Sequence, residues 1–382
     1  DPVLSRGLGD VYKRQDHSAT TPLLPEVSEL INDINREVYG NPSSVYSSGR
    51  KSRSIIENAR NQVANSISAN PEQIIFTSGG TESNNHVLWS LLNNNHRHVV
   101  SNKIEHPAIL KVLHFLSQYG LKYDLVGVLS NGIVSVEEIE KAILPETSLI
   151  SLMLANNEIG TIQPIKDVVE IARKYNVLVH TDAVQCLGKM EVNVLDLGVD
   201  FLSLSAHKFY GPKGVGILYA KDPKKLSSLI IGGGQERGLR AGTESISAIA
   251  GMGLAAEHCV GSLSGKRELL VKLEKKFKSG INKFYKKAIY NGSQSKKLPG
   301  LINISFPKNQ SNIMMAKLDR DGIAISNGPA CGSGDVKPSP VLSEIGIDKQ
   351  TNLSSLRFSF GSTNTSEEVD YLINKLELNL II

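Results

Sequence analysis

Residues 177–208 read VLVHTDAVQCLGKMEVNVLDLGVDFLSLSAHK, and this stretch decides the fold class. It contains two short runs with apolar residues, 177–180 and 201–205, and polar residues follow each run directly. Short buried strands that alternate with longer connections are typical of βαβ units. The stretch therefore predicts two neighbouring strands of a largely parallel sheet.

The same alternation extends outward from this stretch over most of the chain. A shift after Gly261, to a Lys-rich helix, two strands around a Gly/Pro-rich loop and a final helix from Ser366, predicts a smaller α+β domain. We predict strands at 74–77, 98–101, 122–126, 149–154, 177–180, 201–205 and 216–219, later strands at 301–306 and 356–360, and helices at 52–66, 82–92, 107–118, 136–142, 165–175 and 245–259. The expected fold is an α/β seven-stranded, mostly parallel sheet in a large domain, 16–260, with segment 16–25 packing on a small domain, 261–382.

Composition excludes several classes of protein. Of the 382 residues, 42 are basic and 38 acidic, and the resulting net charge of +4 gives little reason to expect a nucleic-acid partner. No apolar run approaches the roughly 20 residues that cross a bilayer, so we expect no membrane span. Three scattered cysteines favour neither a disulfide framework nor a metal site, which indicates a reducing, cytoplasmic compartment. Residues 265–298 carry eleven Lys or Arg and two Glu, which indicates a solvated helix face or, alternatively, a site for an anionic protein.

The N-terminal segment 1–15 has no strand or helix periodicity. Its residues 10–15, DVYKRQ, resemble the translation of a transposon-end adapter used in DNA library preparation. We therefore expect residues 1–15 to be a non-native scar.

Three polar clusters follow predicted strands, where ligands gather in open α/β sheets. Residues 77–82, TSGGTE, place glycines between a strand and a helix, which is typical of a phosphate site or, equally, of a plain tight turn. Asp182 follows the predicted strand at 177–180, and Lys208 follows the predicted strand at 201–205. The two residues are 26 positions apart. An amine, a carboxylate and a phosphate anchor are what pyridoxal 5'-phosphate requires, although a simple Asp182–Lys208 salt bridge would give the same spacing.

Two further residues in the predicted small domain favour amino-acid chemistry. Arg357 lies in an alternating strand pattern and could hold a carboxylate with two hydrogen bonds, or be an exposed strand residue. Cys331 lies in residues 326–340, a Gly/Pro-rich loop, where an unpaired thiol indicates reactivity. Cys186 and Cys259 lie in apolar contexts and are interpreted as buried small residues.

Taken together, several motifs resemble the cysteine desulfurases of the NifS/IscS type, which belong to the class-V aminotransferase family. These motifs are Asp182–Gln185 (DAVQ), Ser205–Lys208 (SAHK) with Gly211–Gly214 (GPKG), Asn41–Ser44 (NPSS), Asn157–Gly160 (NEIG) and Arg237–Thr243 (RGLRAGT). The resemblance covers residues 16–382. Tyr46 and Gly332 stand where the family usually has histidine and threonine.

The resemblance implies a homodimer with pyridoxal 5'-phosphate as its cofactor. Lys208 would bind the cofactor covalently, Asp182 would pair with its ring nitrogen, Gln185 with its phenolic oxygen, and His106 would stack on the ring. Gly80, Thr81, Ser205 and His207 would hold the phosphate, with Thr243 reaching across from the other subunit. Arg357 and Asn157 would bind L-cysteine, and Cys331 would take its sulfur as a persulfide and leave alanine.

The resemblance also implies a sulfur-acceptor protein, such as an iron–sulfur scaffold or a thiolation carrier. It implies no nucleic acid, membrane or metal. Two alternatives stay open at this point. One is a related pyridoxal-phosphate lyase or aminotransferase for another amino acid, selenocysteine included, and the other is a non-catalytic subunit of sulfur assembly, against which intact Lys208, Asp182 and Cys331 argue.

Overall fold

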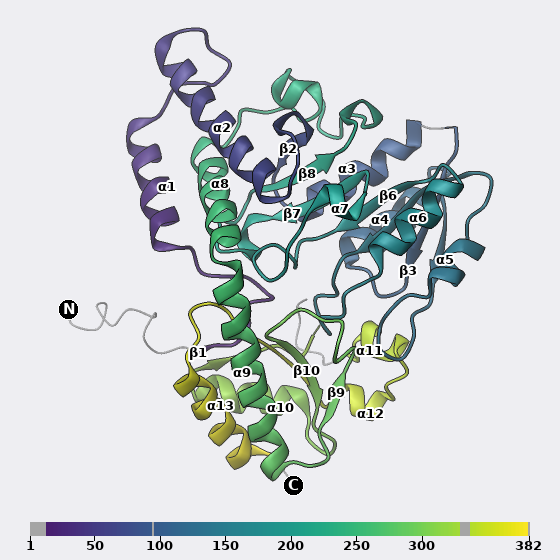
Figure 1. Cartoon of the computed structure of the whole chain (residues 1–382), viewed down its shortest axis with the longest axis vertical. Coiled ribbons are helices and arrows are strands. Elements are labelled where there is room, and N and C mark those ends of the chain that lie inside the picture. The colour runs from purple at the N-terminus through teal and green to yellow at the C-terminus, as the bar shows by residue number, and fades with distance from the viewer. Residues whose placement is uncertain (1–12, 94, 329–336, 381–382) are drawn as a thin grey trace.

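The computed structural model describes residues 13–93, 95–328 and 337–380. A seven-stranded sheet forms the centre of the larger part of the molecule (Figure 1). Its strands run, from edge to edge, β2 (Ile74–Thr77), β8 (Gly216–Ala220), β7 (Phe201–Ser205), β6 (Leu178–Asp182), β5 (Thr147–Met153), β3 (His98–Asn102) and β4 (Lys122–Val126). β4, β3, β5, β6 and β7 are parallel, whereas β8 is antiparallel to both of its neighbours. The predicted mostly parallel sheet is confirmed.

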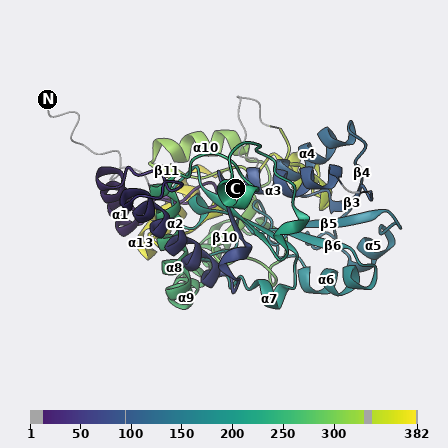
Figure 2. The same cartoon turned by 90° about the horizontal axis from the view of Figure 1, so that it is seen from above.

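Helices cover both faces of this sheet, as the view from above shows (Figure 2). One apolar cluster joins α3 and α4 to one face, and a larger cluster joins α2, α6, α7 and α8 to the other. The bounds of these helices and of α1 and α5 are α1 (Pro25–Glu37), α2 (Ser47–Ser66), α3 (Gly80–Ser90), α4 (Pro107–Ser117), α5 (Val136–Lys141), α6 (Ile165–Lys174), α7 (Val194–Leu197) and α8 (Ile246–Gly261). The strands between the two helix layers are almost entirely buried, except for the edge strand β4.

The lower part of the molecule in Figure 1 has its own apolar cluster between Leu270 and Leu380. It contains an antiparallel sheet, β12–β10–β9, and a short parallel pair, β1 with β11. The elements are α9 (Leu263–Phe284), β9 (Ile289–Asn291), β10 (Leu301–Ser305), α10 (Ser311–Arg320), β11 (Ile323–Ala324), α11 (Pro340–Glu344), α12 (Lys349–Asn352), β12 (Ser355–Ser359), α13 (Ser366–Asn379) and β1 (Lys13–Arg14).

Two predictions about helices were wrong. The residues between β10 and β12 are not simply a loop, because α10, α11 and α12 lie there. The sequence analysis also missed α1, although Pro25 at its first turn and apolar Val27 and Ile34 on one face are ordinary helix signals.

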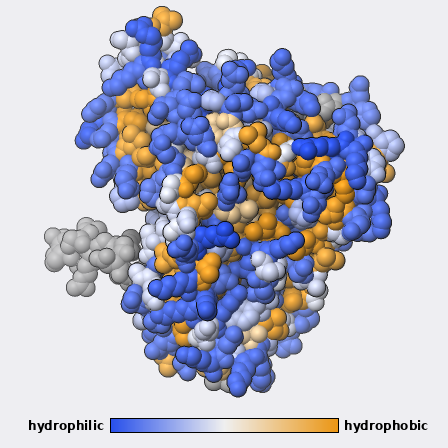
Figure 3. Space-filling model, in the orientation of Figure 1, coloured by the Kyte–Doolittle hydropathy of each residue, from blue (hydrophilic) through white to orange (hydrophobic). Residues whose placement is uncertain are grey.

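Hydrophilic residues cover much of the face shown in Figure 3, and apolar residues gather along α1 and in patches over the sheet. Within the described ranges, no single helix is long and apolar enough to cross a membrane. The consecutive helices α8 and α9 meet at 72°, and only the two together are long and apolar enough.

The N-terminal segment joins the two parts of the molecule. Residues 1–12 lie outside the described residues, but the last three residues of the expected scar pair with the fold. Lys13 and Arg14 align with Ile323 and Ala324, and Gln15 exchanges backbone hydrogen bonds with Ala324 and Ser359. The Gln15 side chain is fully buried, and neither of its amide atoms has a hydrogen-bond partner among the described residues. The backbone at position 15 therefore suits the fold, whereas the amide side chain does not.

We expect Gln15→Leu to raise the free energy of unfolding by about 1–3 kcal/mol, because it removes a buried amide that makes no hydrogen bond. Thermal unfolding measures this as a melting temperature a few degrees higher. Gln15→Glu is the matched control and should lower the melting temperature, since it buries a charge. If Gln15→Leu left the melting temperature unchanged or lowered it, the Gln15 amide would have to make hydrogen bonds in the folded protein.

Candidate active site

A cavity of about 330 Å³ lies beyond the carboxyl ends of β5, β6 and β7, and ten of the predicted site residues line it. Parallel neighbours bring these ends to one edge of the sheet, which is why residues far apart in sequence meet there. The ten are Gly80, Thr81, His106, Asn157, Asp182, Gln185, Ser205, His207, Lys208 and Arg357. Cys331 lies outside the described residues. Thr243 is exposed and lines a different hollow beside Ser78 and Gly214.

Asp182 is the last residue of β6, and its carboxylate is held in place by two donors. The backbone N–H of Val184 donates to Oδ1 at 3.0 Å, and the Asn84 side chain donates to Oδ2 at 2.7 Å. Asn84 lies on α3 and was not predicted from the sequence, since nothing local marks it as a partner of Asp182. Two fixed donors set the position of the carboxyl group at the end of β6, which suits a partner for a ring nitrogen.

Lys208 lies in a 3₁₀ turn that follows β7, and its Nζ donates to the carbonyl oxygens of Ser18 and Ala19, each at 2.7 Å. Burial and the cationic Arg357 lower the Lys208 pKa from 10.5 to about 8. A substantial fraction of the amine is therefore neutral near physiological pH, the form that can attack a carbonyl carbon.

We expect the 13C signal of reductively methylated Lys208 to titrate near pH 8, because burial disfavours the ammonium, which persists below the pKa. The signals of exposed lysines in the same spectrum serve as internal controls, and a lysine in a model peptide titrates near 10.4. Arg357→Met should move the Lys208 midpoint upward, because it removes a cation and leaves Asp16 unpaired. A Lys208 midpoint equal to that of the exposed lysines would contradict the assignment.

The N-terminal turn of α3 closes one end of the cavity. Gly79 precedes it with φ +154°, and a Cβ on Gly80 would lie 2.5 Å from Val184 Cγ2, so the sequence needs glycine there. Gly80, Thr81, Ser205 and His207 line this end. Backbone N–H groups at a helix N-terminus, a hydroxyl and an imidazole form a donor set that suits a phosphate.

Arg357 lies on β12 at the opposite part of the cavity, and its side chain is 1% exposed. It is therefore not the exposed strand residue that the sequence left open. Nη2 pairs with Asp16 at 2.8 Å, and Nη1 donates to the Asn157 carbonyl at 3.0 Å. Arg357 Nε is buried and has no partner within the described part of the chain. A guanidinium that lines the cavity suits a substrate carboxylate.

His106 and Gln185 are oriented by neighbours. His106 caps α4: its Nδ1 accepts a hydrogen bond from the Ala108 N–H at 3.1 Å, and burial lowers its pKa, so the ring is neutral. Gln185 donates to the Ser18 carbonyl and accepts from Lys189, both at 3.0 Å. The sequence analysis missed Lys189, whose pKa burial lowers to about 7.

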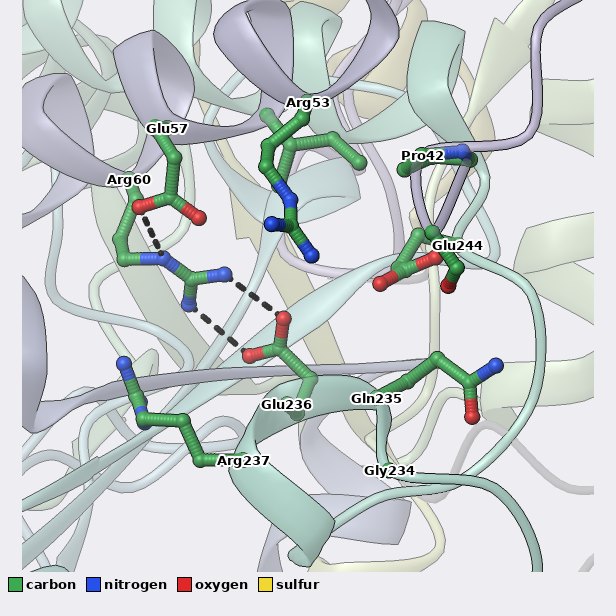
Figure 4. A pocket seen from close by; sticks show the side chains of 11 residues that line it. Pro42, Arg53, Glu57, Arg60, Gly234, Gln235, Glu236, Arg237 and Glu244 are labelled. Atoms are coloured by element: carbon green, nitrogen blue, oxygen red, sulfur yellow. Dashed lines mark hydrogen bonds and ion pairs between the residues drawn. The ribbon is translucent and has the colours of Figure 1, made fainter. Parts of the chain in front are cut away.

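A second hollow, of about 500 Å³, lies beside α2 (Figure 4). Arg60 pairs with both oxygens of Glu236, and Glu236 also accepts from the Phe76 N–H, so a turn is fastened to the edge strand β2. Glu236 and Arg237 both have left-handed backbone conformations, with φ of 47° and 59°. Consecutive non-glycine residues in that region are strained, which marks the turn as one that its surroundings hold in shape.

Comparisons with known proteins place this geometry in a family. A model of the class-V aminotransferases matches residues 15–372, so the chain belongs to that family. The cysteine desulfurase IscS of Dictyoglomus turgidum is 43% identical over 365 residues, 95% of this chain and 93% of the relative. Within the family, the chain belongs with the NifS/IscS-type cysteine desulfurases.

Solved structures agree with this placement. A NifS-like protein superposes with a TM-score of 0.90 at 38% identity and covers 96% of this chain and 98% of its own. A structure described as SspA in complex with cysteine gives a TM-score of 0.82 at 32% identity over 92% of this chain and all of the other.

Proposed function

We propose that the chain is a pyridoxal-phosphate-dependent cysteine desulfurase that converts L-cysteine to L-alanine and passes the sulfur on through Cys331. The observation that carries the proposal is the single cavity in which the Lys208 amine, the Asp182 carboxylate and the Arg357 guanidinium converge. The experiment is to incubate the purified protein with L-cysteine and a thiol reductant. Alanine and sulfide in equal amounts support the proposal, and a transamination product or no product would contradict it.

The donor set of the cavity fits the cofactor. Gly80, Thr81, Ser205 and His207 would hold the phosphate, Asp182 the ring nitrogen, Gln185 the phenolic oxygen and Lys208 the carbonyl carbon, with His106 against the ring. When bound, pyridoxal phosphate supplies an electron sink for the bonds around the substrate's α-carbon.

The chain's own residues then bind the substrate and move protons. Arg357 and Asn157 would hold the cysteine carboxylate, which fixes the amino group on the side of Lys208. The Ser18 and Ala19 carbonyls hold the Lys208 amine in the cavity, where it would act as the base for the proton of the substrate's α-carbon. Cys331 would attack the substrate sulfur: the new S–S bond leaves a persulfide on Cys331, and the carbon that loses sulfur takes a proton to give alanine.

We further infer that the molecule works as a homodimer with residues 16–260 and 261–382 as its two domains. Three exposed apolar residues are close in sequence to Pro42, Ser43 and Gly234, which line the hollow of Figure 4: Tyr39, Val45 and Ile231 are 90%, 85% and 89% exposed. Thr243 lies on the loop that follows this turn and lines a hollow other than its own chain's cavity. A second copy seated on this face would cover the apolar groups and receive Thr243.

We expect Ile231→Asp to shift the protein from dimer toward monomer in light scattering coupled to gel filtration, because it places a charge in the proposed interface. Leu195→Asp is the matched control, since Leu195 is 76% exposed on α7, far from the hollow of Figure 4. A dimer that persisted equally in both variants would place the interface elsewhere.

The acceptor of the sulfur would be a protein such as an iron–sulfur scaffold or a thiolation carrier. A reducing compartment such as the cytoplasm suits the two buried free thiols, Cys186 and Cys259. Burial raises the pKa of each thiol, which keeps both unreactive.

A further inference from the structure

His207 lies at the end of the cavity that would hold the phosphate. Which hydrogen bonds its ring can make depends on its tautomer. Burial and the nearby Lys208 and Lys213 lower its pKa to about 4, so the ring is neutral at physiological pH. A neutral imidazole carries its proton on one nitrogen only. A phosphate oxygen accepts and does not donate, so only the ring nitrogen that carries the proton can bind it.

Nδ1 of His207 lies 3.1 Å from the hydroxyl oxygen of Thr20. Two arrangements are conceivable, one in which the hydroxyl donates to Nδ1 and one in which Nδ1–H donates to the hydroxyl. In the second arrangement the Thr20 hydroxyl proton needs another acceptor. The nearest is the His207 carbonyl oxygen at 3.5 Å, long for an O–H···O bond.

That carbonyl is already occupied. It accepts the Thr21 N–H at 2.8 Å and the Thr21 hydroxyl at 3.0 Å, which uses both of its lone pairs. Nδ1 of His207 is closer to the Thr20 hydroxyl than this carbonyl is, and its lone pair is not used. The Thr20 hydroxyl therefore donates to Nδ1. The ring proton then resides on Nε2, which has no partner among the described residues and is not sealed from solvent. His207 lines the cavity beside Ser205 and Thr81.

We propose that Thr20 is a positioning residue that fixes the Nε2–H tautomer and the ring orientation of His207, so that this side chain donates to the phosphate of the cofactor. Thr20 itself does not line the cavity and acts only through His207. The proposal rests on the proposed function, since it needs a phosphate at this end. It explains why a threonine of the N-terminal segment, 187 residues away in sequence, contacts the residue that precedes Lys208.

The test compares cofactor binding by Thr20→Val, which keeps the shape without the hydroxyl, and Thr20→Ser, which restores the hydroxyl. Dissociation constants are measured on the cofactor-free protein for pyridoxal 5'-phosphate and for pyridoxal, which lacks the phosphate. We expect Thr20→Val to weaken the binding of pyridoxal phosphate by about three- to tenfold and to leave the binding of pyridoxal unchanged. Thr20→Ser should bind both compounds as the wild type does. In a His207→Ala background the valine effect should disappear.

NMR spectroscopy tests the tautomer of His207 directly, without a measurement of cofactor binding. The 15N shifts of His207 in the cofactor-free protein should show a protonated Nε2 in wild type and a mixture of tautomers in Thr20→Val. A protonated Nδ1 in wild type, equal weakening of pyridoxal and pyridoxal phosphate, or no weakening would overturn the proposal. If wild type bound neither compound, the proposed function would fail instead, so the two failures are distinguishable.

Discussion

Replacing Lys208 by alanine is expected to lower the rate of alanine formation from L-cysteine by at least roughly a thousandfold. In the proposed function this residue would supply both the covalent hold on the cofactor and the base for the substrate's α-carbon, and no other described lysine lines the cavity. Lys189 is also buried, but its Nζ is bonded to Gln185. Alanine formation measured under saturating cofactor gives the result.

Two controls separate loss of chemistry from loss of fold. Lys208→Ala should still take up pyridoxal phosphate non-covalently, because the residues at the phosphate end and Asp182 are unchanged. Lys213→Ala, which alters a lysine outside the cavity lining, should retain most of the activity. Activity of Lys208→Ala near that of wild type would remove Lys208 from the reaction.

Replacing Cys331 by alanine is expected to abolish sulfide release while leaving the cofactor's colour and the spectral response to L-cysteine intact. In the proposed function the Cys331 thiol would take the sulfur, whereas residues of the described cavity would hold the cofactor and the substrate. A spectral titration with L-cysteine and a sulfide assay on the same sample separate the two effects. Cys259→Ala is the control and should release sulfide normally, since Cys259 is fully buried. Sulfide release by Cys331→Ala at the wild-type rate would exclude a persulfide on this residue.

Much of the sheet could be predicted from the sequence because its strands are buried on both faces. The strands predicted at 74–77 and 201–205 coincide with β2 and β7, in which every residue is buried. Residues that follow strand ends, such as Asp182 and Lys208, could be placed together for the same reason: parallel strands end at one edge.

The interactions that complete the cavity could not be predicted in the same way. Asp16 pairs with Arg357 across 341 positions, and Asn84 pairs with Asp182 across 98. Neither residue has a local pattern that marks it, because the constraint comes from the packing of distant segments. The missed α10 has another cause: Pro307 and Gly322 on either side of it favour a loop, and only Met314 and Leu318 among its apolar residues are buried.

The central claim is that L-cysteine bound in this cavity loses its sulfur, which is transferred to Cys331. The most direct test is mass spectrometry of the holoenzyme after a single turnover with L-cysteine in the absence of reductant. We predict that the peptide containing Cys331 gains the mass of one sulfur atom, that a thiol reductant removes it, and that one alanine is released per modified site. Alanine release with the added sulfur on Cys186 or Cys259, or on no cysteine at all, would contradict the claim.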